Sequence, residues 1–337
     1  MTRWTGLVTR VRGLTGHLLS DEALEAIEHG RTLTDLRTDL ARFDYGPGAA
    51  VGPPRARELE LDVRRRAAGF IETLARWTLG TPAVLTPFTL GEDLRSIAAC
   101  VRGSLARVAA DEVVLGLIPT PTMPLRALSQ IAGLSTVLDI GGLLTAWRHP
   151  LAGVVVTHAR RSRLDLFSLE QDLVAVWADV CRRDATVWGD RSVRVYVSRL
   201  IDVANLTTAR LLAEQRTDAS LHELFVAGGA FVTADDLGFA ARAHDLELID
   251  GRLTRRGAPR ALRALATSEL PKAEDEMLDA LVAEFVRRGR EDPSGLAPVA
   301  AFFLRLRREQ TRVLRAIGVR ALGLARRGGD AGGEVAA

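Results

Sequence analysis

The sequence of 337 residues contains 45 basic side chains, of which only Lys272 is a lysine. A phosphate-binding loop of the G-x-x-x-x-G-K-[ST] type needs a lysine after its last glycine, and the chain has no such segment. This lack excludes P-loop nucleotide hydrolysis, and any Schiff-base mechanism would have to use Lys272. The excess of arginine over lysine is typical of a GC-rich genome and does not by itself indicate a function.

Cysteines, metal-ligand patterns and long apolar runs are also scarce. Cys100 and Cys181 have no nearby cysteine or histidine at metal-ligand spacing, so we expect reduced, partly buried thiols in a cytosolic protein. The six histidines show no H-E-x-x-H or other paired spacing, which predicts no metal site and no cofactor. No segment has the roughly 20 apolar residues that cross a bilayer, and residues 1–19 lack the apolar core of a signal peptide. A role at a membrane would therefore require a partner that holds the protein there.

The composition favours a large helical protein. Apolar residues make up 47% of the chain, enough to bury a sizeable core. Alanine, leucine and arginine are the commonest residues, whereas glycine and proline gather in a few places, a distribution that suits long helices and leaves little room for a sheet. The sequence predicts an all-α fold.

Apolar residues at intervals of three or four predict the individual helices. We expect four long helices, at residues 55–79, 164–187, 272–288 and 298–324. Shorter helices are expected at 3–19, 22–29 and 33–42, with Ser20 and Asp21 offering an N-cap for the second. Glycines and prolines predict loops at 45–54, 118–124 and 226–231. The pair Gly228-Gly229 could suggest a phosphate-binding loop, but no strand precedes it and no lysine follows, so we interpret it as a tight turn.

A helical phrase recurs along the chain at wide intervals. Its copies read Asp93-x-x-Ser96-Ile97, Asp202-x-x-Asn205-Leu206 and, in a looser form, Leu7-x-x-Arg10-Val11-Arg12-Gly13. Such spacing exceeds the 20 to 50 residues of stacked repeats, so it indicates three whole helical wedges with pseudo-threefold symmetry. We assign residues 1–88 to the first wedge and 89–189 to the second. Residues 190–327 form the third wedge with a closing C-terminal helix, and residues 328–337 a flexible tail.

The phrases also supply the candidate functional residues. Asp202 and Asn205 lie one turn apart on one helix face, where they could form a polar seam between wedges or a docking site. Alternatively, Asp202 is a surface or capping residue. Asp93 is interpreted as a helix cap, because acidic groups at a helix start complement the helix dipole.

Three arginines, Arg10, Arg12 and Arg102, recur at equivalent points and could form forked pairs with carboxylates of another wedge. We expect Arg10 to be exposed and Arg12 to be buried. The surplus of arginine between residues 287 and 327 indicates either a solvated helix face or a docking patch for an acidic partner.

Taken in order, these phrases resemble the C subunit of the V-type/A-type rotary ATPases, the equivalent of the eukaryotic d subunit. Besides the three copies above, the matching positions are Tyr196, Gly228-Gly229-x-Phe231, Pro298, Glu309 and Leu314-Arg315. The sequence departs from the family at Ser96, where asparagine is usual, and at Arg308 and Gln310, near places that are usually acidic. These departures concern the contacts of the last helix and not the fold.

The resemblance implies a funnel of three helical wedges, seated on the ring of membrane proteolipid subunits and receiving the foot of the central axle. A docking site at Asp202 and Asn205 would then be for the axle. Such a protein would be a non-catalytic coupling for ATP-linked proton or sodium transport. It would lie at the cytoplasmic face of the membrane, held by its partners, without binding nucleotide or nucleic acid directly. The candidate structural or interface residues are then Arg10, Arg12, Asp93, Arg102, Tyr196, Asp202, Asn205 and Arg315.

An arginine-rich nucleic-acid-binding protein is the alternative function. It would account for the basic last helix and the pI of about 9.3. However, the positive charge is spread along the chain among 42 acidic residues, and no aromatic cluster accompanies the arginines to stack on bases. A helical enzyme is also disfavoured, because the carboxylates are not grouped with a nucleophile or a set of metal ligands.

Overall fold

Six long helices carry the apolar stripes of the sequence and determine the architecture. The computed structural model describes residues 4–30, 32–46, 52–78, 80–215, 224–243, 247–267 and 270–323, and these ranges contain helices and no strand. The long helices are α4 (Ala56–Arg76), α5 (Thr86–Ala106), α10 (Leu166–Trp188), α11 (Arg191–Gln215), α15 (Leu270–Glu291) and α16 (Ala297–Ala321). The all-α prediction is confirmed. The predicted tail, 328–337, lies outside the described residues.

Shorter helices fill the connections between the long ones. Before α4 come α1 (Thr5–Thr15), α2 (Asp21–His29) and α3 (Leu33–Ala41). Between α5 and α10 come α6 (Ala110–Leu115), α7 (Leu125–Ala132), α8 (Val137–Ala146) and α9 (Ala152–Ala159). Between α11 and α15 come α12 (Ala234–Ala243), α13 (Glu247–Arg255) and α14 (Arg260–Thr267), and the short 3₁₀ helix η1 (Pro82–Leu85) precedes α5.

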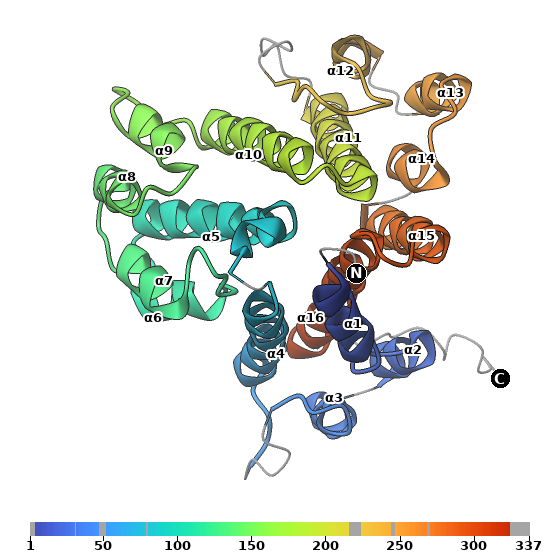
Figure 1. Ribbon diagram of the computed structural model, residues 1–337. Coiled ribbons are helices and arrows are strands. Elements are labelled where there is room, and N and C mark those ends of the chain that lie inside the picture. The colour runs from blue at the N-terminus through green and yellow to red at the C-terminus, as the bar shows by residue number, and fades with distance from the viewer. Residues whose placement is uncertain are drawn as a thin grey trace, which may run out of the picture.

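Each set of short helices is flanked by two long helices. Figure 1 shows three groups of helices around a common centre: α5 to α10, α11 to α15, and α1 to α4 together with α16. Within the last group, α16 packs against α4, α1, α2 and α3, so the C-terminal helix joins the N-terminal group. Contacts between α10 and α11 and between α15 and α16 connect neighbouring groups.

Local signals explain where several helices begin. Ser20 accepts a hydrogen bond from the backbone N–H of Ala23 and caps α2, as the sequence predicts. Thr32 and Asp35 form a reciprocal capping box at the start of α3. Pro87 occupies the first turn of α5, where its missing N–H costs no hydrogen bond.

Two expectations about helix limits are wrong. The first helix ends at Thr15, because residues 16–19 turn away and Leu19 uses its backbone N–H to bind Glu309. Asp93 is not a cap, since α5 begins at Thr86 and continues through Gly91. The predicted boundary at residue 88 therefore lies inside α5.

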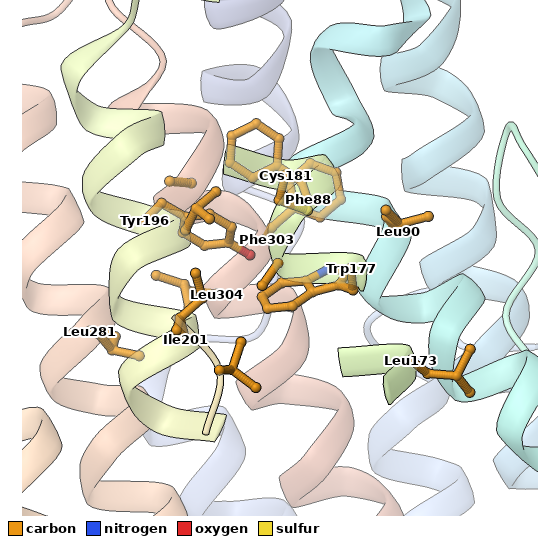
Figure 2. Packing of buried hydrophobic residues seen from close by; sticks show 14 of the residues in the cluster. Phe88, Leu90, Leu173, Trp177, Cys181, Tyr196, Ile201, Leu281, Phe303 and Leu304 are labelled. Carbon is orange, nitrogen blue, oxygen red and sulfur yellow. The ribbon is translucent and has the colours of Figure 1, made fainter. Parts of the chain in front are cut away.

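A continuous aromatic chain joins the three groups at the centre of the core. Its successive ring centroids are 4.9 to 5.9 Å apart, in the order Phe70, Phe302, Phe303, Phe88, Tyr196 and Phe285. Tyr196, Phe88 and Phe303 face one another in Figure 2, each from a different long helix. These contacts contribute about 0.5 to 1.5 kcal/mol per pair beyond the burial of apolar area. Aromatic side chains of all three groups therefore contact one another at the centre.

Candidate functional site

A cavity of about 290 Å³ lies at the centre, enclosed by α4, α5, α10, α11 and α16. Phe88, Tyr196 and Phe303 line one part of it, and all three come from the first two turns of their helices. Thr207 and Leu211, from the second half of α11, line another part, so the cavity runs lengthwise between the long helices. Of the candidates from the sequence, Tyr196 is the one placed here.

Three polar groups of this cavity, on Arg95, Trp177 and Arg307, can only donate hydrogen bonds. Trp177 of α10 lines the cavity, and its buried indole nitrogen has no hydrogen-bond partner in the described part of the chain. Arg307 of α16 also lines the cavity, and burial, followed by the neighbouring Arg95, lowers the pKa of its guanidinium. Burial is also the largest single influence on Arg95, and it lowers the pKa. The charge of Glu92 and the hydrogen bond that it accepts from Arg95 act together in the opposite direction, so the pKa of Arg95 is raised. No signal in the sequence marks Trp177 or Arg307. Trp177 is one of many apolar residues on the inward faces of the long helices, and Arg307 is one of many arginines on α16.

Asp202 and Asn205 hold the loop between α11 and α12. Both side chains are 0% exposed. The Asp202 carboxylate accepts backbone N–H bonds from Ala230, Phe231 and Val232 at 3.0 to 3.1 Å. Asn205 accepts from the N–H of Val226 at 2.9 Å and donates to its carbonyl at 2.8 Å. Burial raises the pKa of Asp202, and the three N–H bonds oppose that rise. Enclosed in this way, the pair secures the loop, and a partner would have to displace the loop to reach it.

The Gly228-Gly229 pair makes this loop possible. Gly228 has φ of +110°, a conformation that side chains other than glycine rarely adopt. A Cβ atom on Gly229 would collide with the Asp202 carboxylate. The interpretation as a tight turn is therefore confirmed, and the turn brings the backbone N–H groups onto Asp202.

Asp93 has the corresponding position in the second group. It is fully buried on α5 and accepts hydrogen bonds from the hydroxyls of Thr120 and Thr122, in the loop before α7. The ring of His149, in the turn between α8 and α9, lies 3.3 Å from the same carboxylate. As with Asp202, a carboxylate on a long helix secures the loop that follows it.

Glu309 of α16 is the buried carboxylate that secures a loop in the first group. Its side chain is 2% exposed and accepts hydrogen bonds from the backbone N–H of Leu19, at 2.6 Å, and from the hydroxyl of Tyr45. The guanidinium of Arg66 lies over the Tyr45 ring and 4.0 Å from the carboxylate. Each of the three groups thus contains one buried carboxylate that holds a loop, although the third is on α16 and not on the opening helix.

Replacing Glu309 by glutamine should reduce the pH dependence of stability. Burial raises the pKa of Glu309, despite the bonds from Tyr45 and Leu19 and the charge of Arg66, so the folded protein holds this proton more tightly than the unfolded chain does. This contribution is complete below the unfolded pKa and is lost as the pH rises through the folded pKa. Glutamine cannot titrate but keeps an oxygen for the N–H of Leu19.

Urea unfolding of both proteins between about pH 5 and pH 8 measures this effect. Relative to Glu309→Gln, the wild type should gain about 1 kcal/mol of unfolding free energy toward the acidic end. A difference that is constant, or that favours the wild type at the alkaline end, would contradict the expectation.

The arginine candidates lie at the surface. Arg10 is exposed, as expected, and its guanidinium lies 5.8 Å from the centroid of the Trp77 ring. Arg12 is also exposed, so the expectation that it is buried is wrong; it donates to the carbonyl of Pro293 at 2.8 Å. Its neighbours Val11 and Leu14 take the inward face of α1. Arg102 pairs with Glu170 across α5 and α10.

Carboxylates of neighbouring helices pair with three of the arginines of α16. Arg308 bridges Asp21 of α2 and Asp279 of α15. Arg312 pairs with Glu28 of α2, and the candidate Arg315 pairs with Asp275 of α15. The arginines thus connect α16 to its neighbours, which weakens the case for a docking patch for an acidic partner on this face.

Neither cysteine is available for surface chemistry. Cys100 and Cys181 are both buried free thiols, and burial raises the pKa of Cys100 to about 12. In the described ranges no group of three or more His, Cys, Asp or Glu side chains is placed to hold a metal ion. None of the described helices has both the length and the apolar character of a membrane span.

Comparison with known proteins identifies the family. The model of the ATP synthase (C/AC39) subunit family matches residues 7–326. The C subunit of the V-type ATP synthase of Deinococcus radiodurans is 29% identical over 248 residues, which are 67% of this chain and 64% of that protein. Formate-dependent phosphoribosylglycinamide formyltransferase of Rhodococcus jostii is 27% identical over 277 residues, 77% of this chain and 63% of that protein.

The matched segments thus span less than two thirds of either relative, and the two relatives have different names. The family model decides between them, because it covers nearly the whole chain. It also agrees with the order of the phrases at Asp93 and Asp202 and with a described structure built of helices alone. The chain belongs to the ATP synthase (C/AC39) subunit family.

Proposed function

We propose that this chain is a non-catalytic coupling of a V/A-type rotary ATPase, which receives the foot of the central axle and sits on the membrane proteolipid ring. The three helix groups would form a funnel with pseudo-threefold symmetry. In that arrangement the protein lies at the cytoplasmic face of the membrane and is held there by its partners. The family and the name of the Deinococcus radiodurans relative support a role within such a complex.

The observation that carries the proposal is the central cavity between helices of all three groups. An element that passes torque must deform little under load, and close-packed protein interiors have low compressibility. The aromatic chain from Phe70 to Phe285 places such packing directly beside the cavity. A shaft entering the cavity would therefore push on helices of every group at once.

The internal ion pairs of α16 do not favour the nucleic-acid alternative. Binding to a phosphate backbone depends on basic side chains that are free to replace counterions. Arg308, Arg312 and Arg315 already have carboxylate partners within the protein.

Filling the cavity tests the coupling function. Ala204 of α11 lines the cavity, and Ala204→Trp would place a large ring where the axle foot is proposed to enter. We expect affinity purification of this variant from native membranes to recover axle and proteolipid subunits at least about tenfold less efficiently than the wild type. Ala26→Trp, on the exposed side of α2, is the matched control and should recover both.

Equal urea midpoints of the two variants would show that Ala204→Trp still folds. If the wild-type chain itself brings down no other ATPase subunit, the coupling function is wrong. If Ala204→Trp recovers the axle as well as Ala26→Trp does, the cavity is not the seat.

A further inference from the structure

The side chains of Trp177, Tyr196 and Arg307 bring three hydrogen-bond donors to the central cavity. Trp177 and Tyr196 are each 6% exposed. The indole N–H of Trp177 is buried and has no hydrogen-bond partner within the described ranges, and the side chain of Tyr196 lines the same cavity. Arg307, half-buried on α16, forms no ion pair with a described residue. Tyrosine hydroxyls and indole N–H groups usually find a partner when they are buried, and leaving one unmet costs free energy.

Three of the acceptor side chains near these donors are already occupied. Glu92, the one acidic side chain among the described residues lining the cavity, pairs with Arg95. Gln171 and Thr208 hydrogen-bond to each other. Glu274 of α15 acts on Arg307 at longer range, and it lies 4.0 Å from Arg315. The cavity therefore contains one cation without an ion pair to a described residue and two neutral donors, beside the paired polar side chains and the amide of Gln310.

These groups define the chemistry of an occupant. A donor-lined apolar cavity is satisfied by an acceptor, and an unpaired guanidinium is best satisfied by a carboxylate. A volume of about 290 Å³ is at the lower end of ligand sites, so it admits a few side chains. A volume of this size has room for side chains but not for a whole helix, so the backbone of the entering segment would stay outside.

We propose that the protein segment entering this cavity brings an acidic side chain to Arg307 and hydrogen-bond acceptors to Tyr196 and Trp177. The inference rests on the proposed function, since it describes the foot of the axle that the cavity would receive. The acidic side chain is carried by an apolar segment end, which packs on Phe88 and Phe303. Arg307 thereby selects the partner, and the aromatic wall supports it.

The test measures binding of the full-length chain to the purified axle subunits of the same complex by titration calorimetry. Arg307→Gln removes the charge and should raise the Kd about 30-fold or more, as expected when one partner of a desolvated charge pair is lost. Arg307→Lys keeps the charge, and its Kd should lie between those of the wild type and Arg307→Gln. The matched control is Arg305→Gln, which removes a half-buried arginine of the same helix that does not line the cavity, and it should leave the Kd within about threefold.

The indole N–H of Trp177 provides a direct probe. Its ¹⁵N–¹H signal is assigned by its absence from the spectrum of Trp177→Phe, and adding the axle subunits should shift it downfield as a hydrogen bond forms. Tyr196→Phe, which deletes only the hydroxyl, should raise the Kd several-fold. This second variant keeps the inference testable if Arg307→Gln folds poorly.

The outcomes separate two failures. If wild-type protein does not bind the axle subunits, the coupling function fails. If wild type, Arg307→Gln, Tyr196→Phe and Arg305→Gln all bind equally well, the function stands and this inference is wrong. Octanoate, a free acid with an apolar stem, serves as a further probe. If octanoate shifts the Trp177 signal at micromolar concentration and the axle does not, the cavity holds a small acid, and the inference is also overturned.

Discussion

Asp202→Ala will lower the free energy of unfolding by about 3 kcal/mol or more. The substitution removes the acceptor of three backbone N–H groups, those of Ala230, Phe231 and Val232. Each buried donor left without a partner costs about 1 to 3 kcal/mol, and partial entry of water keeps the sum below the simple total. The loop carries Phe231, whose ring lies 4.8 Å from the guanidinium of Arg199, so its loosening should also disturb α11.

Chemical denaturation in urea measures this loss, with Asp179→Ala as the matched control. Asp179 is also a helical aspartate, but its side chain is 60% exposed and pairs with Arg182 on the same helix, so its removal should cost less than about 1 kcal/mol. The free energy of unfolding of Asp202→Asn should lie between those of the wild type and Asp202→Ala, because asparagine keeps one acceptor oxygen. Equal stability of Asp202→Ala and Asp179→Ala would show that the loop is held by other contacts.

Apolar stripes predict four of the six long helices, whereas α5 and α11 are marked in the sequence by the recurring phrase. The expected limits of the second long helix, 164–187, differ from those of α10 by two residues at its start and one at its end. Trp188-Gly189 marks its end, and Gly189 indeed adopts a positive φ of +69°. In such helices the local pattern and the tertiary packing favour the same conformation, so the sequence alone suffices.

Asp93 shows where local reasoning fails. Gly91 before it suggests a helix start, since glycine is common at helix ends, but Gly91 lies in the second turn of α5 beside the central cavity. The true start is determined by η1 and Pro87, and the partners of Asp93 come from a loop 27 and 29 residues further on. A contact at that separation depends on the fold and leaves no periodic signal.

The central cavity could not be predicted for a similar reason. Arg307 is one of several arginines on α16. Successive residues of a helix point in different directions around its axis, so whether an arginine faces α2, α15 or the cavity depends on how α16 is rotated about its axis in the fold. Arg308, next in the chain, bridges Asp21 and Asp279, whereas Arg307 lines the cavity. Arg12 and Val11 present the same problem on α1, where the aliphatic neighbour takes the buried position.

The three loop-holding carboxylates, Asp93, Asp202 and Glu309, suggest how the groups are related. Each lies on a long helix that packs near the centre, and each accepts hydrogen bonds from a connection leading to or between shorter helices. The recurring phrase is thus a useful guide to Asp93 and Asp202. Glu309, which holds a loop in the same way, lies outside the recurring phrase near the end of the chain, because α16 packs into the N-terminal group. This arrangement supports the proposed pseudo-threefold relation.

Phe88→Ala will be the most damaging change at the centre, with an expected loss of about 3 to 5 kcal/mol of unfolding free energy. The ring of Phe88 stacks on Phe303 at 5.3 Å and meets Tyr196 at 4.9 Å, so one side chain of α5 contacts both α16 and α11. Removing it leaves a hole beside the existing cavity, and the surrounding long helices can relax into it only in part. The expected loss is large because helices of all three groups meet there.

Phe88→Leu separates loss of volume from loss of the aromatic contacts. Leucine keeps most of the apolar bulk, so this variant should lose less than about 1.5 kcal/mol. Urea unfolding of both variants provides the comparison, and hydrogen exchange shows which helices open first. In Phe88→Ala, faster exchange should extend to α11 and α16, since the ring joins them to α5. If exchange rises in α5 alone, the aromatic chain does not couple the groups, and a rigid central body would have to rest on other contacts.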